Sequence, residues 1–280
     1  MPKLLNTNLE QHTLAANPYG FSATRIEDLG ASEYTLATLV VDSSGSTCGF
    51  RTEMVRAIKD VVKSCKFSPR AANLLLRLVE FDSSLREIHG FKLLSQCNES
   101  DYDGCLTLNG CTSLYDAADN SVGAMIQYGK DLSDQDFDVN AITIVLTDGG
   151  DNTSKLSPTA VKKTFQSAVQ SESLESLVSI LVGVNIPVLN IGAKQDELNI
   201  AELQQEVTLN ASATAQQELD NFRRVGEIAE FGIDAGFTQY IGLNAADSKT
   251  LARLAEFVSK SISSQSQSLG SGGGSQSLSF

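Results

Sequence analysis

Asp42, Ser44 and Ser46 are the residues whose types and spacing are best suited to chemistry. They occupy alternate positions directly after a run of β-forming residues, so a carboxylate and two hydroxyls can turn toward one point where the strand ends. Only oxygen atoms are offered, and oxygens are the ligands of hard cations such as Mg2+ and Mn2+. The pattern is weak evidence by itself, because serine-rich loops are common.

Two later segments strengthen the metal hypothesis. Thr112 lies in a loop before a helical pattern, and Asp148 ends a second apolar strand. Serines and aspartates at such places often cap helices or stabilise turns, and for one segment that simpler interpretation is preferred. It does not account for five positions across three loops. The sequence therefore predicts one divalent-cation site formed by Asp42, Ser44, Ser46, Thr112 and Asp148.

These five residues together resemble the metal-ion-dependent adhesion site, or MIDAS, of von Willebrand factor A (VWA) domains, as found in integrin inserted domains and in many bacterial and phage proteins. Every expected position carries the expected residue type, and the resemblance covers roughly residues 34–262. It implies that Ser44 and Ser46 bind Mg2+, Mn2+ or Ca2+ and that Thr112 does so directly or through water. The resemblance also implies that Asp42 and Asp148 mainly hold coordinating waters and the serine hydroxyls, and that an open metal position accepts an acidic side chain of a partner protein.

Strand-like and helix-like segments alternate along the chain, which indicates an α/β fold. We expect a doubly wound, mostly parallel central sheet with helices on both faces and one antiparallel edge hairpin. Ligands of such sheets bind outside the carboxyl ends of the strands, where Asp42 and Asp148 both sit. Strands are expected at 35–41, 74–81, 85–94, 141–147, 177–184 and 237–243, and helices at 51–65, 113–129, from 157, at 197–206, from 214 to near 232 and from 247 to 262.

The composition divides the chain into three parts. Residues 1–33 form a polar N-terminal extension, residues 34–262 the VWA-like domain, and residues 263–280 a flexible tail rich in serine, glutamine and glycine. The tail has no charged side chain and carries Ser-Gln-Ser-Leu twice around a glycine-rich spacer, a composition that cannot form a core. A docking peptide that ends in Phe280 is the alternative interpretation.

Length and charge limit the possible partners and location. A chain of 280 residues with 41% hydrophobic residues can bury a substantial core. The net charge of -13 argues against a nucleic-acid partner, because no Lys/Arg stripe is available to neutralise phosphates. No apolar run has the length of a membrane span, and the start of the chain lacks the apolar stretch of a signal peptide. We therefore expect a cytoplasmic protein, in the host cytoplasm if the gene is of phage origin.

Other candidate sites are weaker. Five cysteines without a C-x-x-C pair and two distant histidines do not suggest a zinc site, and reduced thiols are preferred over a redox pair within residues 97–111. Residues 134–145 begin like an EF-hand loop but lack its glycine and glutamate, and Asp101 and Asp103 fit a solvated turn. The sequence contains no phosphate-binding loop and no Ser–His–Asp set, so we expect no enzymatic activity.

Three functions remain to be weighed. The preferred one is a metal-dependent protein-binding adaptor, with a MoxR-type AAA+ ATPase as one candidate partner, because stand-alone members of the resembled family often look like such adaptors. The second is a phage virion or adhesin-like protein that uses the same site to bind a surface receptor. The third is a metal-dependent hydrolase, for which the sequence offers no base or nucleophile outside the metal shell.

Overall fold

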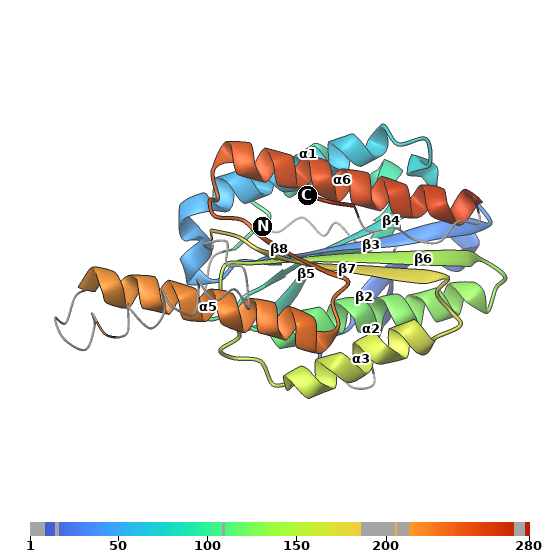
Figure 1. The fold of residues 1–280 in the computed structure, drawn as a ribbon. Helices are drawn as coiled ribbons and strands as arrows, with labels where there is room; N and C mark the ends of the chain where they lie inside the picture. The colour runs from blue at the N-terminus through green and yellow to red at the C-terminus, as the bar shows by residue number, and fades with distance from the viewer. Residues whose placement is uncertain (1–8, 15–16, 108–109, 186–204, 206–212, 272–277) are drawn as a thin grey trace.

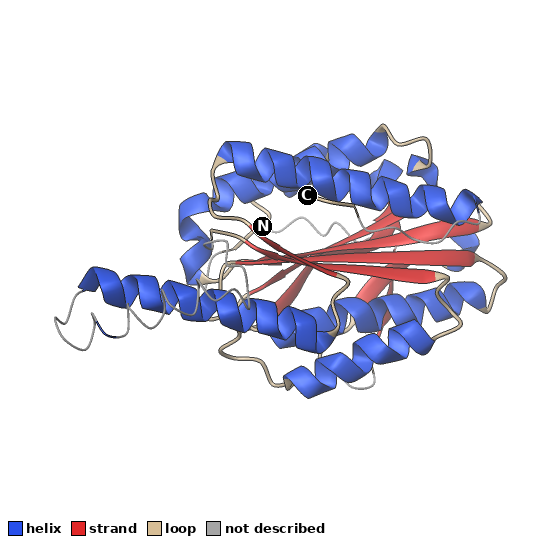
Figure 2. Cartoon of the chain, in the orientation of Figure 1, coloured by secondary structure: helices blue, strands red, loops and turns tan. Residues whose placement is uncertain are grey.

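The computed structural model describes residues 9–14, 17–107, 110–185, 205, 213–271 and 278–280. Within these residues, eight strands form one twisted sheet in the order β1-β2-β5-β4-β3-β6-β7-β8 (Figure 1, Figure 2). The strands are β1 (Leu9–His12), β2 (Phe21–Thr24), β3 (Glu33–Asp42), β4 (Leu74–Phe81), β5 (Leu85–Leu93), β6 (Asp138–Thr147), β7 (Ser176–Gly183) and β8 (Gln239–Gly242).

Helices cover both faces of the sheet (Figure 1). Two of them, α1 and α6, lie side by side on one face, and α2, α3 and α5 lie on the other. The helices are α1 (Arg51–Lys66), α2 (Leu114–Ser133), α3 (Pro158–Gln170), α5 (Ala213–Ala235) and α6 (Ser248–Ser271). A short 3-10 helix, η2 (Gly45–Phe50), connects β3 to α1.

The strands that carry the predicted site are central. β3 pairs in parallel with β4 and with β6, so that Asp42 lies opposite Phe81 and Val41 opposite Leu146. After its first residue, each of β3 and β6 is buried throughout, which explains why their sequences are mainly apolar. The predicted doubly wound α/β fold with a mostly parallel sheet is confirmed.

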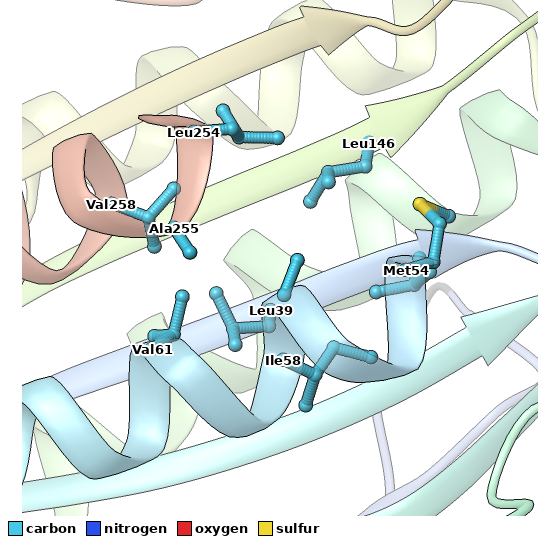
Figure 3. A pocket seen from close by; sticks show the side chains of 10 residues that line it. Leu39, Met54, Ile58, Val61, Leu146, Leu254, Ala255 and Val258 are labelled. Carbon is cyan, nitrogen blue, oxygen red and sulfur yellow. The ribbon is translucent and has the colours of Figure 1, made fainter. Parts of the chain in front are cut away.

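Apolar side chains from α1, α6 and the central strands close one face of the sheet. Met54 and Ile58 of α1 lie near Leu39 of β3, and Leu254 and Val258 come from α6 (Figure 3). They surround an apolar cavity of about 20 Å3, which is room for about one water molecule. This dense layer supports the central strands on which the site is built.

The predicted antiparallel pair of β4 and β5 is present, but it is not the edge of the sheet. β2 pairs in parallel with β5 through Ala23 and Phe91, and β1 pairs with β2, so the N-terminal extension supplies the outer two strands. Partly buried polar contacts hold this addition in place. Nε of Arg77 donates to Oε2 of Glu87 at 2.7 Å, and Oε1 of Glu87 accepts a hydrogen bond from the backbone N of Ser22 at 3.0 Å.

The last helix is longer than its sequence pattern predicts. α6 continues to Ser271, beyond the expected end at residue 262, so residues 263–271 are helical rather than part of a flexible tail. Gln265 is buried, and its Nε2 donates to Oγ of Ser176 at 2.7 Å. A polar side chain can occupy this buried position because the start of β7 supplies its hydrogen-bond partner.

The end of the chain returns to α6. The ring of Phe280 lies edge-on to that of Phe257, with 5.6 Å between the centroids, and the Arg253 guanidinium lies 5.0 Å from the Phe280 ring centre. The helix predicted at 197–206 and the side chains of Thr214 and Gln217, predicted to cap α5, lie outside the described part of the structure. None of the described helices is long and apolar enough to cross a membrane.

Candidate metal centre

Three loops meet at the carboxyl ends of the central strands. The first begins at Asp42, the last residue of β3; the second precedes α2; the third begins at Asp148, directly after β6. Parallel strands end at the same edge of a sheet, which brings the first and third loops together. The second loop joins them through a backbone hydrogen bond of 3.3 Å from Gly45 N to the oxygen of Gly110.

Four of the five predicted residues form one hydrogen-bonded series. Oδ1 of Asp42 accepts a hydrogen bond from the backbone N of Ser44 at 2.8 Å. The hydroxyls of Ser44 and Ser46 are 3.1 Å apart, and Oγ of Ser46 donates to Oδ1 of Asp148 at 2.7 Å. Ser46 has one hydroxyl proton and gives it to Asp148, so toward Ser44 its oxygen can only accept. Each hydroxyl therefore keeps a lone pair that can face a cation.

Thr112, the fifth predicted residue, joins the group through its backbone. Its N donates to Oδ1 of Asn152 at 2.7 Å, and the N of Asn152 donates to the oxygen of Thr112 at 3.0 Å. Thr112 is 4% exposed, as is Asp148, whereas Ser46 is exposed. The series therefore opens toward solvent on the side of Ser46.

Asp42 is a buried carboxyl group close to a second one. Burial raises its pKa to about 6; hydrogen bonds from Ser44 and Thr147 act in the opposite direction, and the nearby charge of Asp148 adds to the rise. The hydrogen bonds to Asp42 come from neutral donors. A cation beside this pair of carboxyl groups would favour their ionised forms.

The donor set fits a hard divalent cation. It consists of serine and threonine hydroxyls and two carboxylates, and oxygens of this kind suit Mg2+, Mn2+ or Ca2+. Soft metals prefer thiolate and imidazole ligands. In the part of the chain that the structure describes, no cluster of three or more His, Cys, Asp or Glu side chains could hold a metal ion.

Two residues with a role in this arrangement were not identified from the sequence. Oγ1 of Thr147, the last residue of β6, donates to Oδ2 of Asp42 at 2.7 Å. Asn152 makes the two hydrogen bonds to the Thr112 backbone described above. Both lie in the segment Thr147–Asn152 around Asp148, so the only available signal was proximity to a predicted ligand. Their partners lie in other loops, and only the tertiary structure reveals them.

Comparisons with known proteins find similarity only among solved structures. No protein-family model matches the sequence, and no curated protein matches it. A von Willebrand factor type A protein from Catenulispora acidiphila is 14% identical over 88% of this chain and 44% of that one, with a TM-score of 0.49. The PilB minor pilin from Streptococcus sanguinis is 15% identical over 85% of this chain and 63% of that one, with a TM-score of 0.46.

A third similar structure was solved with a metal. Proximal thread matrix protein 1 from the mussel byssus, with a zinc-occupied MIDAS motif, is 17% identical over 84% of this chain and 47% of that one, with a TM-score of 0.43. The present chain spans less than two thirds of the length of each of these three proteins. The resemblance to VWA domains therefore rests on the five site residues and the sheet topology.

Proposed function

We propose that this chain is a metal-dependent protein-binding module that grips an acidic residue of a partner through a divalent cation. The observation that carries the proposal is the hydrogen-bonded series from Asp42 through Ser44 and Ser46 to Asp148. It gathers oxygens from two loops at the ligand-binding edge of the sheet. The hydroxyl orientations it imposes leave lone pairs available to a cation.

Each residue has a distinct role in this proposal. Ser44 and Ser46 hold the cation through their hydroxyls, and Thr112 does so directly or through water. Asp42 and Asp148 orient the serine hydroxyls and the coordinating waters. When bound, the cation supplies an electrophilic position, because neutral hydroxyls compensate little of its charge. The exposed side of Ser46 is where a carboxylate of the partner would approach.

The cation would also offset electrostatic repulsion between this chain and an acidic partner. A protein with a net charge of -13 repels an acidic partner surface at low ionic strength. A divalent cation at the contact offsets that repulsion locally, where the separation of the charges is shortest. Partner binding should therefore depend on the metal even if the surrounding loops decide which partner is chosen.

The cellular role in this proposal is that of a cytoplasmic adaptor, and a MoxR-type AAA+ ATPase is one candidate partner. All five cysteines are free, which favours a reducing compartment. We propose no catalytic role. His89 is enclosed by the hydrogen bonds of its ring nitrogens to Tyr102 and Gly90, and His12 lies on β1 beside Asp131. Neither histidine is placed to serve as a base at the metal centre.

Isothermal titration calorimetry with Mg2+ and Mn2+ tests the metal site. The wild type should bind one cation, and Asp42→Ala should not. Asp28→Ala, which removes an exposed carboxylate elsewhere, is the control and should bind normally. Equal binding by wild type and Asp42→Ala would exclude this site.

Partner binding is tested on the immobilised chain. Proteins retained in Mg2+ should be released by EDTA and should fail to bind an Asp42→Ala column. Loss of a charge-assisted contact of this kind costs roughly 2–5 kcal/mol, which is about 30- to several thousand-fold in affinity. A partner held equally tightly in EDTA would contradict the proposed mode of binding.

A further inference from the structure

The second and third loops of the candidate metal centre are joined by a reciprocal pair of hydrogen bonds. The side-chain Oδ1 of Asn152 accepts from the backbone N of Thr112 at 2.7 Å, and the backbone N of Asn152 donates to the oxygen of Thr112 at 3.0 Å. Both polar groups of the Thr112 backbone are thus occupied by one residue. Its main chain cannot rotate without breaking one of these bonds.

The rest of the third loop is anchored on the first turn of α2. The carboxylate of Asp116 is 2% exposed and accepts hydrogen bonds from the backbone N of Lys155 at 3.1 Å and of Leu156 at 2.9 Å. Oδ1 of Asp151 accepts one from the backbone N of Tyr115 at 3.3 Å. Since Thr112 directly precedes this turn, the second loop, the third loop and the start of α2 form one connected unit.

The first loop is anchored elsewhere. The backbone N and the hydroxyl of Ser43 both donate to the oxygen of Phe81 on β4, at 2.8 Å and 3.1 Å. The bonds from Gly45 to Gly110 and from Ser46 to Asp148 connect it to the other unit. The residue after Phe81, Asp82, also holds the second loop, because its backbone oxygen accepts hydrogen bonds from the backbone N and the hydroxyl of Ser113 at 2.8 Å and 2.7 Å. The metal centre therefore lies where the three loops meet, and Thr112 must be placed correctly among them.

We infer that Asn152 is a positioning residue for the metal centre, because it fixes Thr112 relative to Asp148. This inference rests on the proposed function, since it concerns the same cation. Asn152 does not itself bind the metal; it holds the backbone of Thr112, whose hydroxyl is a ligand in the proposed function. Residues that orient metal ligands in this way typically change metal affinity by about 10- to 100-fold when they are removed.

The test compares Asn152→Ala, which removes the side-chain acceptor, with Asn152→Asp, which keeps an oxygen at that position. Asn73→Ala is the matched control, since Nδ2 of Asn73 donates to the Glu33 oxygen at 2.9 Å near the amino ends of the strands, away from the metal loops. Mg2+ and Mn2+ affinity is measured by calorimetry, and hydrogen exchange of the Thr112 amide is measured without metal. Asn152 is exposed, so the fold should survive both substitutions, and thermal unfolding checks this.

We expect Asn152→Ala to bind Mg2+ about 10- to 100-fold more weakly and to exchange the Thr112 amide faster than wild type. Asn152→Asp should bind Mg2+ at least as tightly as wild type does. Asn73→Ala should have the same Mg2+ affinity as wild type. If wild type binds Mg2+ and Asn152→Ala binds within twofold of it, this inference is wrong while the proposed function stands. If wild type binds no divalent cation, the proposed function and this inference fail together.

Discussion

Ser46 donates its hydroxyl proton to Oδ1 of Asp148 at 2.7 Å, across 102 positions of sequence. The bond joins the loop after β3 to the loop after β6, whose parallel pairing places the two loops at the same edge. It also limits the neighbouring contact, because the Ser46 oxygen can then only accept from Ser44. The two serines and the aspartate therefore act as one unit.

Ser46→Ala should weaken Mg2+ binding by about tenfold or more, because it removes one proposed ligand and releases Ser44 and Asp148 from their orientations. Ser46 is exposed, so thermal stability should change little. Ser167→Ala, which removes an exposed hydroxyl from α3, is the control. Calorimetric titration decides the outcome, and an unchanged affinity for Mg2+ would show that Ser46 is not a ligand.

Thr147→Val should lower the free energy of unfolding by roughly 1–3 kcal/mol, because Oδ2 of Asp42 and the backbone of Gly149 lose their hydrogen-bond partner. Thr38→Val on β3 is the matched control, since the Thr38 hydroxyl is buried without a hydrogen-bond partner and its removal should be neutral or stabilising. Urea denaturation of the metal-free proteins measures both. Equal losses in the two variants would mean that the bond to Asp42 contributes nothing specific.

His89 should make stability depend on pH. Burial is the main cause that lowers the pKa of His89 from 6.5 to about 3, and the charges of Lys92 and, to a smaller extent, Arg77 lower it further. A hydrogen bond to Gly90 and the charge of Asp101 oppose the shift. The unfolded chain thus binds a proton that the folded chain excludes. This contribution to stability is complete above pH 6.5 and is lost as pH falls from 6.5 toward 3.

The slope due to His89 alone should approach about 1.4 kcal/mol per pH unit at most. Carboxyl groups also titrate below pH 5, so the comparison is between wild type and His89→Gln. Urea unfolding between pH 4.5 and 7.5 should show a steeper decline toward acid for wild type. Parallel curves for the two proteins would contradict a neutral, buried His89.

Gly110→Ala should damage the metal centre. Gly110 has φ of 64°, and an added Cβ would lie 2.2 Å from Oγ of Ser83. Gly104 has φ of 65° with nothing within 4 Å of the added Cβ, so Gly104→Ala carries the backbone strain alone, about 1–2 kcal/mol. Only Gly110→Ala should also weaken Mg2+ binding in calorimetry. Similar Mg2+ affinities in the two variants would show that the second loop is not part of the metal site.

Much of the fold follows from the sequence because its patterns are local. Mainly apolar segments such as β3 and β6 need burial on both faces, and a parallel sheet between helices is the structure that provides it. Asp42 and Asp148 stand at the ends of these runs, so their convergence follows from the direction of the strands. The residue types at the three loops then indicate oxygen ligands for a hard cation.

Tertiary structure decided the features whose partners are distant in the chain. β2 has only four residues, too few for a periodic signal, and it joins the sheet because Glu87 and Phe91 of β5 pair with it. α6 extends through a polar segment because Gln265 finds a partner on β7. Thr147 and Asn152 look ordinary in sequence. Thr147 acquires its role because parallel strand ends bring Asp42 within hydrogen-bond distance, and Asn152 because the loop before α2 brings Thr112 beside it.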